Sequence, residues 1–447
     1  MIRNISVTAC SVLLTWAPNV WSAEPLKLTL PEAVQLALSQ NHALKIARLR
    51  VLENDAKKAG ARSSYFPELK NQSGFLHSTS VENIQIPAGA FGVIPNAGLV
   101  PTHPILIDQG NQTYVLSGTT LAQPLTPLIR IRQASRIASS EIAASQDELK
   151  SAENEVALKV HQLYYGILVA GLELQAAEQD CAYAVTRLRE SEEDIRNGSA
   201  LKISALEGRT GVLESEQSIL AATLHLSDLA TELNELMGTP LSATLELKPP
   251  ETARLDSPAR EEYIKTAIAG NPKVLAAMEA VEQAKAGVTA AKSAFIPDVS
   301  AFAKHSYQNG VPFLVHNFGT FGLTLTYDVF DFGKRRATIR EREAKLAEAQ
   351  ENVERLKEAV SVEIDGAYNK MERTKHMLKV VAEVVELRAE AERVAENQMA
   401  QGVVLASVRR QASAASYKAR SQQLQVQLAY RLAFAELEQA AGRTPGL

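Results

Sequence analysis

Cysteine is scarce in this sequence. The chain has two cysteines, Cys10 and Cys181, in 447 residues. Cys10 lies in an N-terminal segment that we expect to be removed, so the mature chain would keep Cys181 alone. A single cysteine excludes an intramolecular disulfide even in an oxidising compartment. Stability must therefore come from packing and from assembly with other chains.

Long hydrophobic runs are also missing. Beyond residue 23, no stretch approaches the roughly 18 uncharged apolar residues that a membrane-spanning helix needs. Only helices and closed barrels satisfy their backbone hydrogen bonds in lipid, so we expect any membrane crossing to be a β-barrel. The formal net charge is -4, without acidic or basic blocks. This charge distribution gives no sign of a nucleic-acid partner.

The signatures of catalysis are absent as well. The eight histidines include no pair at positions i and i+4 and have no companion cysteines, so metal-ligand spacing is missing. Neither a phosphate-binding glycine loop with its lysine nor a Gly-x-Ser-x-Gly elbow occurs. We therefore expect no enzyme, no cofactor and no metal. His161 falls on an apolar helical seam and is expected to be a packed residue.

The N-terminus has the order of a secretory signal peptide. Arg3 precedes an uncharged apolar run at residues 5–16, and Pro18 then breaks the run ahead of Ser22 and Ala23. We predict a signal peptide over 1–23, with cleavage after either Ser22 or Ala23. Lipidation at Cys10 is the alternative, although only six residues separate Cys10 from Arg3.

The remaining chain is two copies of one unit. A gapless offset of 230 and a second offset of 204 superpose the two halves, and repeated positions of this kind indicate duplication. The first offset carries Ala37, Asn41, Ala61 and Pro67 onto Ala267, Asn271, Ala291 and Pro297, and the second carries Tyr164, Gly198 and Gly238 onto Tyr368, Gly402 and Gly442. The first copy therefore spans 24–240 and the second 259–447, with a linker at 241–258.

Each copy is predicted to contain a long antiparallel helical hairpin. No proline interrupts 128–239 or 313–444, so long helices are allowed. Apolar residues recur every three or four positions, as in a coiled-coil seam. Gly198 and Gly402 can adopt the left-handed conformation that ends a helix. We predict helical hairpins over 128–240 and 333–442, each preceded by a shorter helix at the start of its copy.

Four strands are predicted between these helices. Residues 319–330 alternate between apolar and small or polar side chains, which is typical of a membrane-barrel wall. Residues 297–307 alternate less clearly, and 67–77 and 113–125 occupy the equivalent places in the first copy. The first copy has 26 extra residues rich in proline and glycine, so 78–112 is predicted to be a long loop. Four strands cannot close a membrane barrel, so several chains must contribute.

These features together resemble the outer membrane efflux protein family, the TolC-like ducts. The resemblance rests on residues 28–33, on 61–67 with its repeat 291–297, on 327–334, and on Gly198 and Gly402. It implies a mainly α fold with a small β part and a homotrimer in which three sets of four strands form a 12-stranded barrel in outer-membrane lipid. It also implies a helical tunnel through the periplasm, with a periplasmic adaptor and an inner-membrane transporter as partners that meet the tips at Gly198 and Gly402.

One departure from the family concerns the aperture at the helical tips. Members often carry aspartates just after the turn glycine of the second copy, where they form a cation-sensitive ring. Here those positions are Val408 and Gln411, with Arg409 and Arg410 between them, while Glu207 lies nearby in the first copy. We therefore expect a mixed or basic ring in which Glu207, Arg409 and Arg410 line or lock the closed aperture. The alternative is that these three residues are solvated or form surface ion pairs.

Two functions remain open at this point. The first is the exit duct of a tripartite efflux or type I secretion system, gated at its tip by partners. The second is a soluble periplasmic coiled-coil scaffold or adaptor without a barrel. The scaffold accounts for the helices and for export, but it leaves the alternation at 319–330 unexplained.

Overall fold

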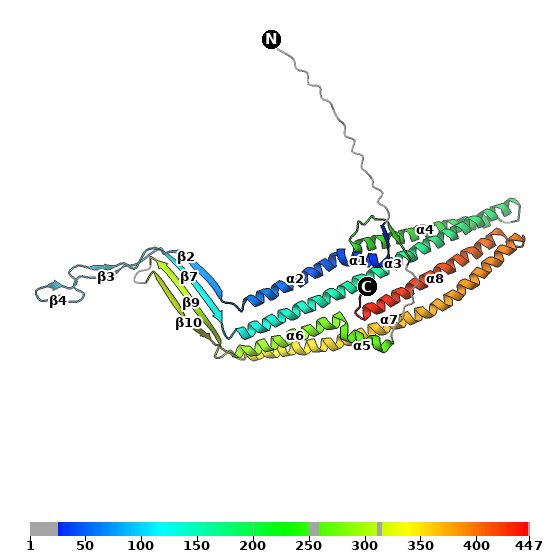
Figure 1. Cartoon of the computed structure of the whole chain (residues 1–447). Coiled ribbons are helices and arrows are strands. Elements are labelled where there is room, and N and C mark those ends of the chain that lie inside the picture. The colour runs from blue at the N-terminus through cyan, green and yellow to red at the C-terminus, as the bar shows by residue number, and fades with distance from the viewer. Residues whose placement is uncertain (1–25, 200, 250–258, 311–314, 446–447) are drawn as a thin grey trace, which may run out of the picture.

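The computed structural model describes residues 26–199, 201–249, 259–310 and 315–445. The predicted signal peptide and Cys10 lie outside these residues. The molecule is elongated, with a β-sheet at one end from which long helices run to the other end (Figure 1). This arrangement of long helices and a small sheet confirms the predicted fold class.

The sheet has four antiparallel strands in the order β10-β9-β7-β2. These strands are β2 (Glu68–His77), β7 (Thr113–Pro124), β9 (Asp298–Asn309) and β10 (Asn317–Thr326). Each occupies a place where the sequence predicts a strand, although β9 runs two residues further and β10 ends four residues earlier. Among the described residues, no strand pairs with the outer edge of β2 or of β10.

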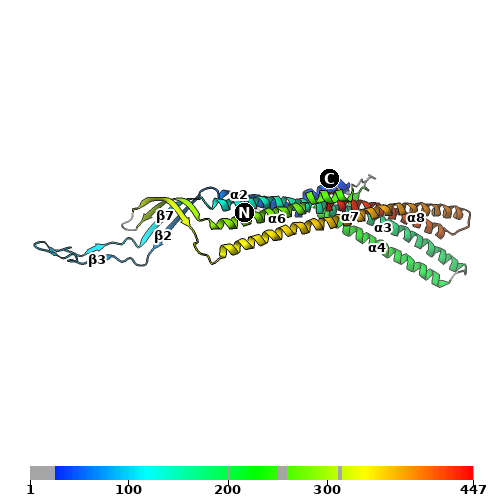
Figure 2. The same ribbon diagram turned by 90° about the horizontal axis from the view of Figure 1, so that it is seen from below.

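The segment predicted as a long loop, 78–112, contains short strands instead. β3 (Ile84–Ile86) pairs with β6 (Ile105–Ile107), and β4 (Val93–Ile94) pairs with β5 (Gly98–Leu99). The segment therefore forms a narrow arm that extends beyond the sheet (Figures 1 and 2). Its prolines and glycines hide the strands from sequence analysis, because each paired stretch has only two or three residues.

Four long helices make the two predicted hairpins. In the first copy α3 (Leu128–Arg196) is followed by α4 (Lys202–Met237), and in the second α7 (Lys334–Ala400) is followed by α8 (Ala406–Ala440). With 69 residues in α3, a rise of about 1.5 Å per residue gives a rod of roughly 100 Å. The predicted seam faces inward, with Val160, Ile364 and Met371 almost fully buried.

The helix predicted at the start of each copy is in fact two helices. α1 (Leu30–Gln40) and α2 (His42–Ser63) meet at Asn41, and α5 (Arg260–Gly270) and α6 (Pro272–Lys292) meet at Asn271. A short 3-10 turn, Ser293–Phe295, then leads to β9.

The two asparagines make equivalent contacts. The side-chain oxygen of Asn41 accepts the amide hydrogens of Ala43 and Leu44, and that of Asn271 accepts the amide hydrogen of Lys273. The amide nitrogen of Asn41 donates to the carbonyl of Leu236 at 3.1 Å, and that of Asn271 donates to the carbonyl of Ala440 at 3.0 Å. These bonds are related by the same offsets of 230 and 204 as the sequence, which supports the duplication.

A small sheet ties the start of the chain to the region between the copies. β1 (Leu26–Leu28) pairs in parallel with β8 (Leu245–Leu247), which lies within the segment predicted as a linker. The buried Tyr164 hydroxyl lies 3.0 Å from the carbonyl oxygen of Leu28 and 2.7 Å from that of Lys248, and it donates to these carbonyls. Burial raises the pKa of Tyr164 to about 12.

The helices near the sheet lie side by side in the order α2, α3, α6 and α7. The buried residues of the helices form two cores, one around Tyr164 on α3 and Leu233 on α4, and one around Tyr263 on α5, Ile364 on α7 and Leu437 on α8. Across the described ranges, no helix has both the length and the apolar character to span a bilayer.

Candidate functional site

The tips of the two hairpins reverse the chain in the same way. Gly198 and Gly402 have φ values of 77° and 73°, in the left-handed region. The residue after each glycine donates its amide hydrogen back across the turn, from Ser199 to Asp194 at 2.9 Å and from Val403 to Gln398 at 2.9 Å. Apart from each glycine and its chain neighbours, no atom of the described residues lies within 4 Å of a Cβ added at either glycine. The glycines are thus required by backbone conformation rather than by packing.

Both tips expose apolar side chains. Leu201 is 75% exposed and Leu405, its counterpart under the offset of 204, is 66% exposed. Ile203 and Val403 are also exposed. The two tips lie at the same end of the molecule (Figures 1 and 2). Exposed aliphatic residues clustered at one end are a candidate docking surface for another protein.

Glu207 lies in the first hairpin. It is exposed and lines a groove of about 550 Å³ between α3 and α4, whose other walls include Tyr183, Arg187 and Asp194. α3 and α4 pack closely at this level, because an added Cβ at Gly208 would lie 3.3 Å from the Cα of Leu188.

Arg409 and Arg410 lie in the first turns of α8. Nη1 of Arg409 lies 3.7 Å from Oε1 of Glu396, on the α7 helix of the same hairpin, and its side chain is 32% exposed. Arg410 is exposed. Across the described ranges, no ion pair or hydrogen bond joins Glu207 to either arginine. The three residues predicted to line the aperture are thus near the same end but on different hairpins.

A contact that sequence analysis missed links the two hairpins close to their tips. The carboxylate of Glu190, on α3, accepts the amide hydrogen of Ser407, the second residue of α8, at 2.9 Å. A helix N-terminus leaves its first amides without partners and carries a partial positive charge, so a carboxylate there stabilises it. No side chain within the hairpin fills this position, because the capping residue is Leu405.

Further from the tips, two more polar contacts join α3 to α8. The Tyr417 hydroxyl donates to the side-chain oxygen of Gln175, and Nε2 of Gln425 donates to Oε1 of Glu173 at 3.4 Å. Together with Glu190, they make a line of side-chain contacts along the two helices. Sequence separation of more than 200 residues leaves no local pattern from which they could be predicted.

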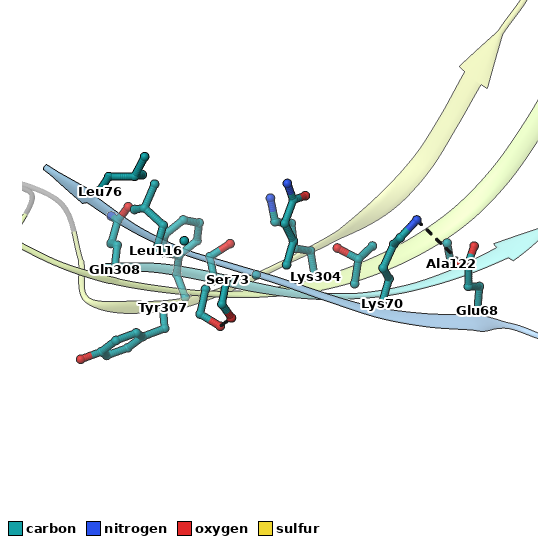
Figure 3. A pocket seen from close by; sticks show the side chains of 16 residues that line it. Glu68, Lys70, Ser73, Leu76, Leu116, Ala122, Lys304, Tyr307 and Gln308 are labelled. Atoms are coloured by element: carbon teal, nitrogen blue, oxygen red, sulfur yellow. Dashed lines mark hydrogen bonds and ion pairs between the residues drawn. The ribbon is translucent and has the colours of Figure 1, made fainter. Parts of the chain in front are cut away.

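At the other end of the molecule, the four-stranded sheet has two unlike faces. On the convex face, Phe321 is 86% exposed and Leu323 is 70% exposed. The concave face carries polar side chains, including Lys70, Lys304 and Gln308, and it encloses a hollow of about 700 Å³ (Figure 3). In the same view Tyr307 points to the opposite side of the sheet.

Two exposed apolar rows follow the outer sides of the long helices. Leu213 and Leu220 lie seven residues apart on α4, and Val380 and Leu387 lie seven residues apart on α7. All four side chains are between 58% and 71% exposed in the single chain. Heptad rows of this kind need a neighbouring helix to cover them.

The described residues hold no group of three or more histidine, cysteine or acidic side chains that could bind a metal. Glu207, Arg409 and Arg410 lie at the same end of the molecule as the exposed side chains of Leu201 and Leu405. The structure thus has hairpin tips at one end, side-chain contacts between the two hairpins, and at the other end a sheet with one apolar and one polar face.

Comparison with known proteins identifies a family with these features. The family model described as outer membrane efflux protein matches residues 33–239 and 263–443. The outer membrane efflux protein BepC of Brucella suis is 23% identical over 374 residues, which cover 82% of this chain and 74% of BepC.

Solved structures share the fold at low identity. The Campylobacter jejuni CmeC outer membrane channel matches with a TM-score of 0.75 and 15% identity over 99% of this chain and 94% of that chain. The open state of the Neisseria gonorrhoeae MtrE outer membrane channel matches with a TM-score of 0.68 and 17% identity over 93% and 89%. Because the family model covers both copies of the repeat, the chain belongs to the outer membrane efflux protein family.

Proposed function

We propose that this chain is one subunit of a homotrimeric duct in the outer membrane, which extends into the periplasm. The observation that carries the proposal is the sheet. It has two edges that no other described strand pairs with, an apolar convex face and a polar concave face. Unpaired edges are unstable in lipid unless another chain completes them.

Three copies would complete the sheet as a 12-stranded barrel. With strands about 4.8 Å apart and tilted by roughly 40°, twelve strands close at a backbone radius of about 12 Å. β2 of one chain would pair with β10 of the next. The exposed Phe321 and Leu323 would then face lipid, and the concave face would line the lumen.

The helices support the same trimer. Leu213 and Leu220 on α4, and Val380 and Leu387 on α7, lie on the outer sides of the hairpins within the chain. In a ring of three chains, α4 of one chain comes next to α7 of its neighbour. Both apolar rows are then buried, which removes the exposed surface that a single chain leaves to water.

The tips would bind a periplasmic adaptor, which connects the duct to an inner-membrane transporter. Leu201 and Leu405 give an apolar rim at the turns marked by Gly198 and Gly402. Energy for transport comes from the transporter, since the sequence carries no nucleotide-binding motif. The duct is the exit path of a tripartite efflux or type I secretion system.

The helical end would act as the gate. Glu190 holds the N-terminus of α8 against α3, and Arg409 is paired within its own hairpin. Opening the aperture requires the hairpins to move apart, so the Glu190 contact favours the closed arrangement. Arg409, Arg410 and Glu207 would set the electric field at the aperture. The charge of that ring would be basic or mixed rather than acidic.

Fractionation followed by bilayer recording tests the duct. The expressed protein should be recovered from the outer membrane, run in detergent at the size of three chains, and conduct ions in a planar bilayer. A soluble, non-conducting periplasmic species would instead support the coiled-coil scaffold. The convex face weighs against that alternative, because a soluble scaffold has no reason to expose Phe321 and Leu323.

Replacing Glu190 by alanine tests the gate. Loss of a capping side chain costs about 1 kcal/mol per chain, so concerted opening of three chains would gain about 3 kcal/mol, or roughly a hundredfold. We expect a larger open fraction in single-channel records. Glu192→Ala, at an exposed position on the same helix, is the matched control and should leave gating unchanged. Equal gating in both variants would remove Glu190 from the mechanism.

A further inference from the structure

The strand register places two lysines in one row across the sheet. Lys70 on β2 is directly opposite Thr120 on β7, Thr120 is opposite Lys304 on β9, and Lys304 is opposite Thr320 on β10. Residues directly opposite one another share a face of a sheet. The row therefore reads Lys, Thr, Lys, Thr, and it lies on the concave face (Figure 3).

Lys70 and Lys304 are the positively charged side chains that the described residues of the four strands place on the concave face. Among the described residues of the four strands, the other charged side chains on this face are Glu68 and Asp298. Asp298 is neutralised by Arg130, whose Nη2 lies 2.6 Å from its carboxylate. Glu68 lies 3.9 Å from the Nζ of Lys70, a loose contact in which both side chains are more than 70% exposed.

Lys304 differs from Lys70 in having no acidic side chain within ion-pair distance among the described residues. Within the part of the chain that the structure describes, it makes no ion pair. Its side chain lies across the neighbouring strand, with Cε 3.1 Å from where a Cβ of Gly118 would stand. Glycine at position 118 thus leaves room for this ammonium group over the concave face.

We propose that Lys70 and Lys304 of three chains form an anion-favouring filter inside the barrel. This inference rests on the proposed trimeric duct. Because barrel strands tilt by roughly 40°, the two lysines, two strands apart, differ in height by about 6 Å. The filter is therefore two stacked rings of three ammonium groups, with the Thr120 hydroxyls between the two levels and the Thr320 hydroxyls beyond the Lys304 level.

The charge of the filter follows from the residues. Six lysines and three copies of Glu68 give the barrel a net charge of +3. A permeating ion on the axis lies at most about 12 Å from the backbone wall, which is close to the Debye length of about 10 Å in 0.1 M salt. Ring charges at this distance act on every ion that passes, as in other channels with charged rings. The cargo that this filter favours is anionic.

A charge series tests the filter by the reversal potential in a KCl gradient. Glu68→Gln raises the ring charge to +6, Lys304→Gln lowers it to zero, and Lys70→Gln with Lys304→Gln lowers it to -3. Three unit charges about 10 Å from the axis, screened over one Debye length, change the chloride-to-potassium permeability ratio about fourfold. We expect the ratio to fall stepwise along the series and to drop below one in the double variant.

Controls distinguish a failure of the filter proposal from a failure of the duct proposal. Lys27→Gln removes the same charge from β1, away from the four-stranded sheet (Figure 1), and should leave the ratio unchanged. Each channel is first shown to be a trimer, and if the double variant fails to assemble, the other three channels still span +6 to zero. If the wild type conducts but every variant has the same chloride-to-potassium permeability ratio, the filter is refuted and the duct is not. A wild-type protein that does not conduct overturns the duct.

Discussion

His161 makes the stability of the helical body depend on pH. His161 is 5% exposed, and neither ring nitrogen makes a hydrogen bond of ordinary geometry among the described residues, although the Pro445 carbonyl lies near the ring. The ring packs edge-on against Tyr165, with centroids 5.7 Å apart. Burial lowers the pKa of His161 from 6.5 to about 4, an effect that the Pro445 carbonyl only partly opposes. The folded chain therefore holds a neutral imidazole.

The sign of the effect follows from proton binding. At pH 8 the imidazole is neutral in both the folded and the unfolded chain, so the folded state keeps its full stability. Below pH 6.5 the unfolded chain binds a proton that the folded chain does not, and stability falls as the pH falls. With pKa values of about 4 and 6.5, the loss is about 2 kcal/mol per chain at pH 5 and about 3 kcal/mol below pH 4.

The assay compares the wild type with His161→Leu, which cannot take up a proton and fills the same apolar site. Denaturant unfolding of the detergent-solubilised protein is followed by circular dichroism at pH 8 and at pH 5. The difference between the two pH values gives the loss in free energy of unfolding for the wild type and for the variant. Between pH 8 and pH 5, we expect the free energy of unfolding to fall by about 2 kcal/mol less per chain in the variant than in the wild type. His225→Leu, at an exposed position on α4, should behave as wild type. An equal loss in wild type and His161→Leu would refute the reasoning.

Three further experiments test the gate, the trimer and a turn. Replacing Arg409 and Arg410 by alanine should raise single-channel conductance and shift ion preference toward cations, and unchanged records would reject their role at the aperture. Leu220→Glu places a carboxylate in the proposed interface between chains, at a cost of about 3 kcal/mol or more, so light scattering should show loss of the trimer. Gly442→Ala should destabilise the chain more than Gly402→Ala does. Both substitutions place a side chain at a positive φ, which costs about 1 to 2 kcal/mol. At Gly442 the new Cβ also lies 2.8 Å from the Cα of Asn271. Equal unfolding midpoints for the two variants would contradict this added clash.

Much of the fold follows from local sequence patterns. The alternation at 319–330 predicts β10 because the side chains of a strand point to opposite faces in turn. Gly198 and Gly402 mark the tips, since a helix that ends in the left-handed conformation favours glycine. The offsets of 230 and 204 predict the duplication, and the hydrogen bonds of Asn41 and Asn271 repeat it. The family resemblance rests on the same repeated motifs.

Other expectations depended on information that a local pattern does not contain. The break at Asn41 was missed because the helical periodicity continues on both sides of it. The segment predicted as a linker pairs through β8 with the start of the chain. The sequence groups Glu207, Arg409 and Arg410 by their distance from the turn glycines, and only the structure shows that Arg409 forms an ion pair with Glu396. Charges near a turn can point in several directions, and only packing chooses among them.

The sequence by itself determined the class of the fold: duplicated and mainly helical, with four strands between the helices. Its hydrophobic periods and turn residues act over a few neighbours along the chain, and that is enough to specify helices, strands and tips. The tertiary structure alone decided which remote residues meet. Glu190 caps α8 across 217 residues, and Lys70 and Lys304 share a row because strand register, which no local pattern records, brings them to the same level of one face.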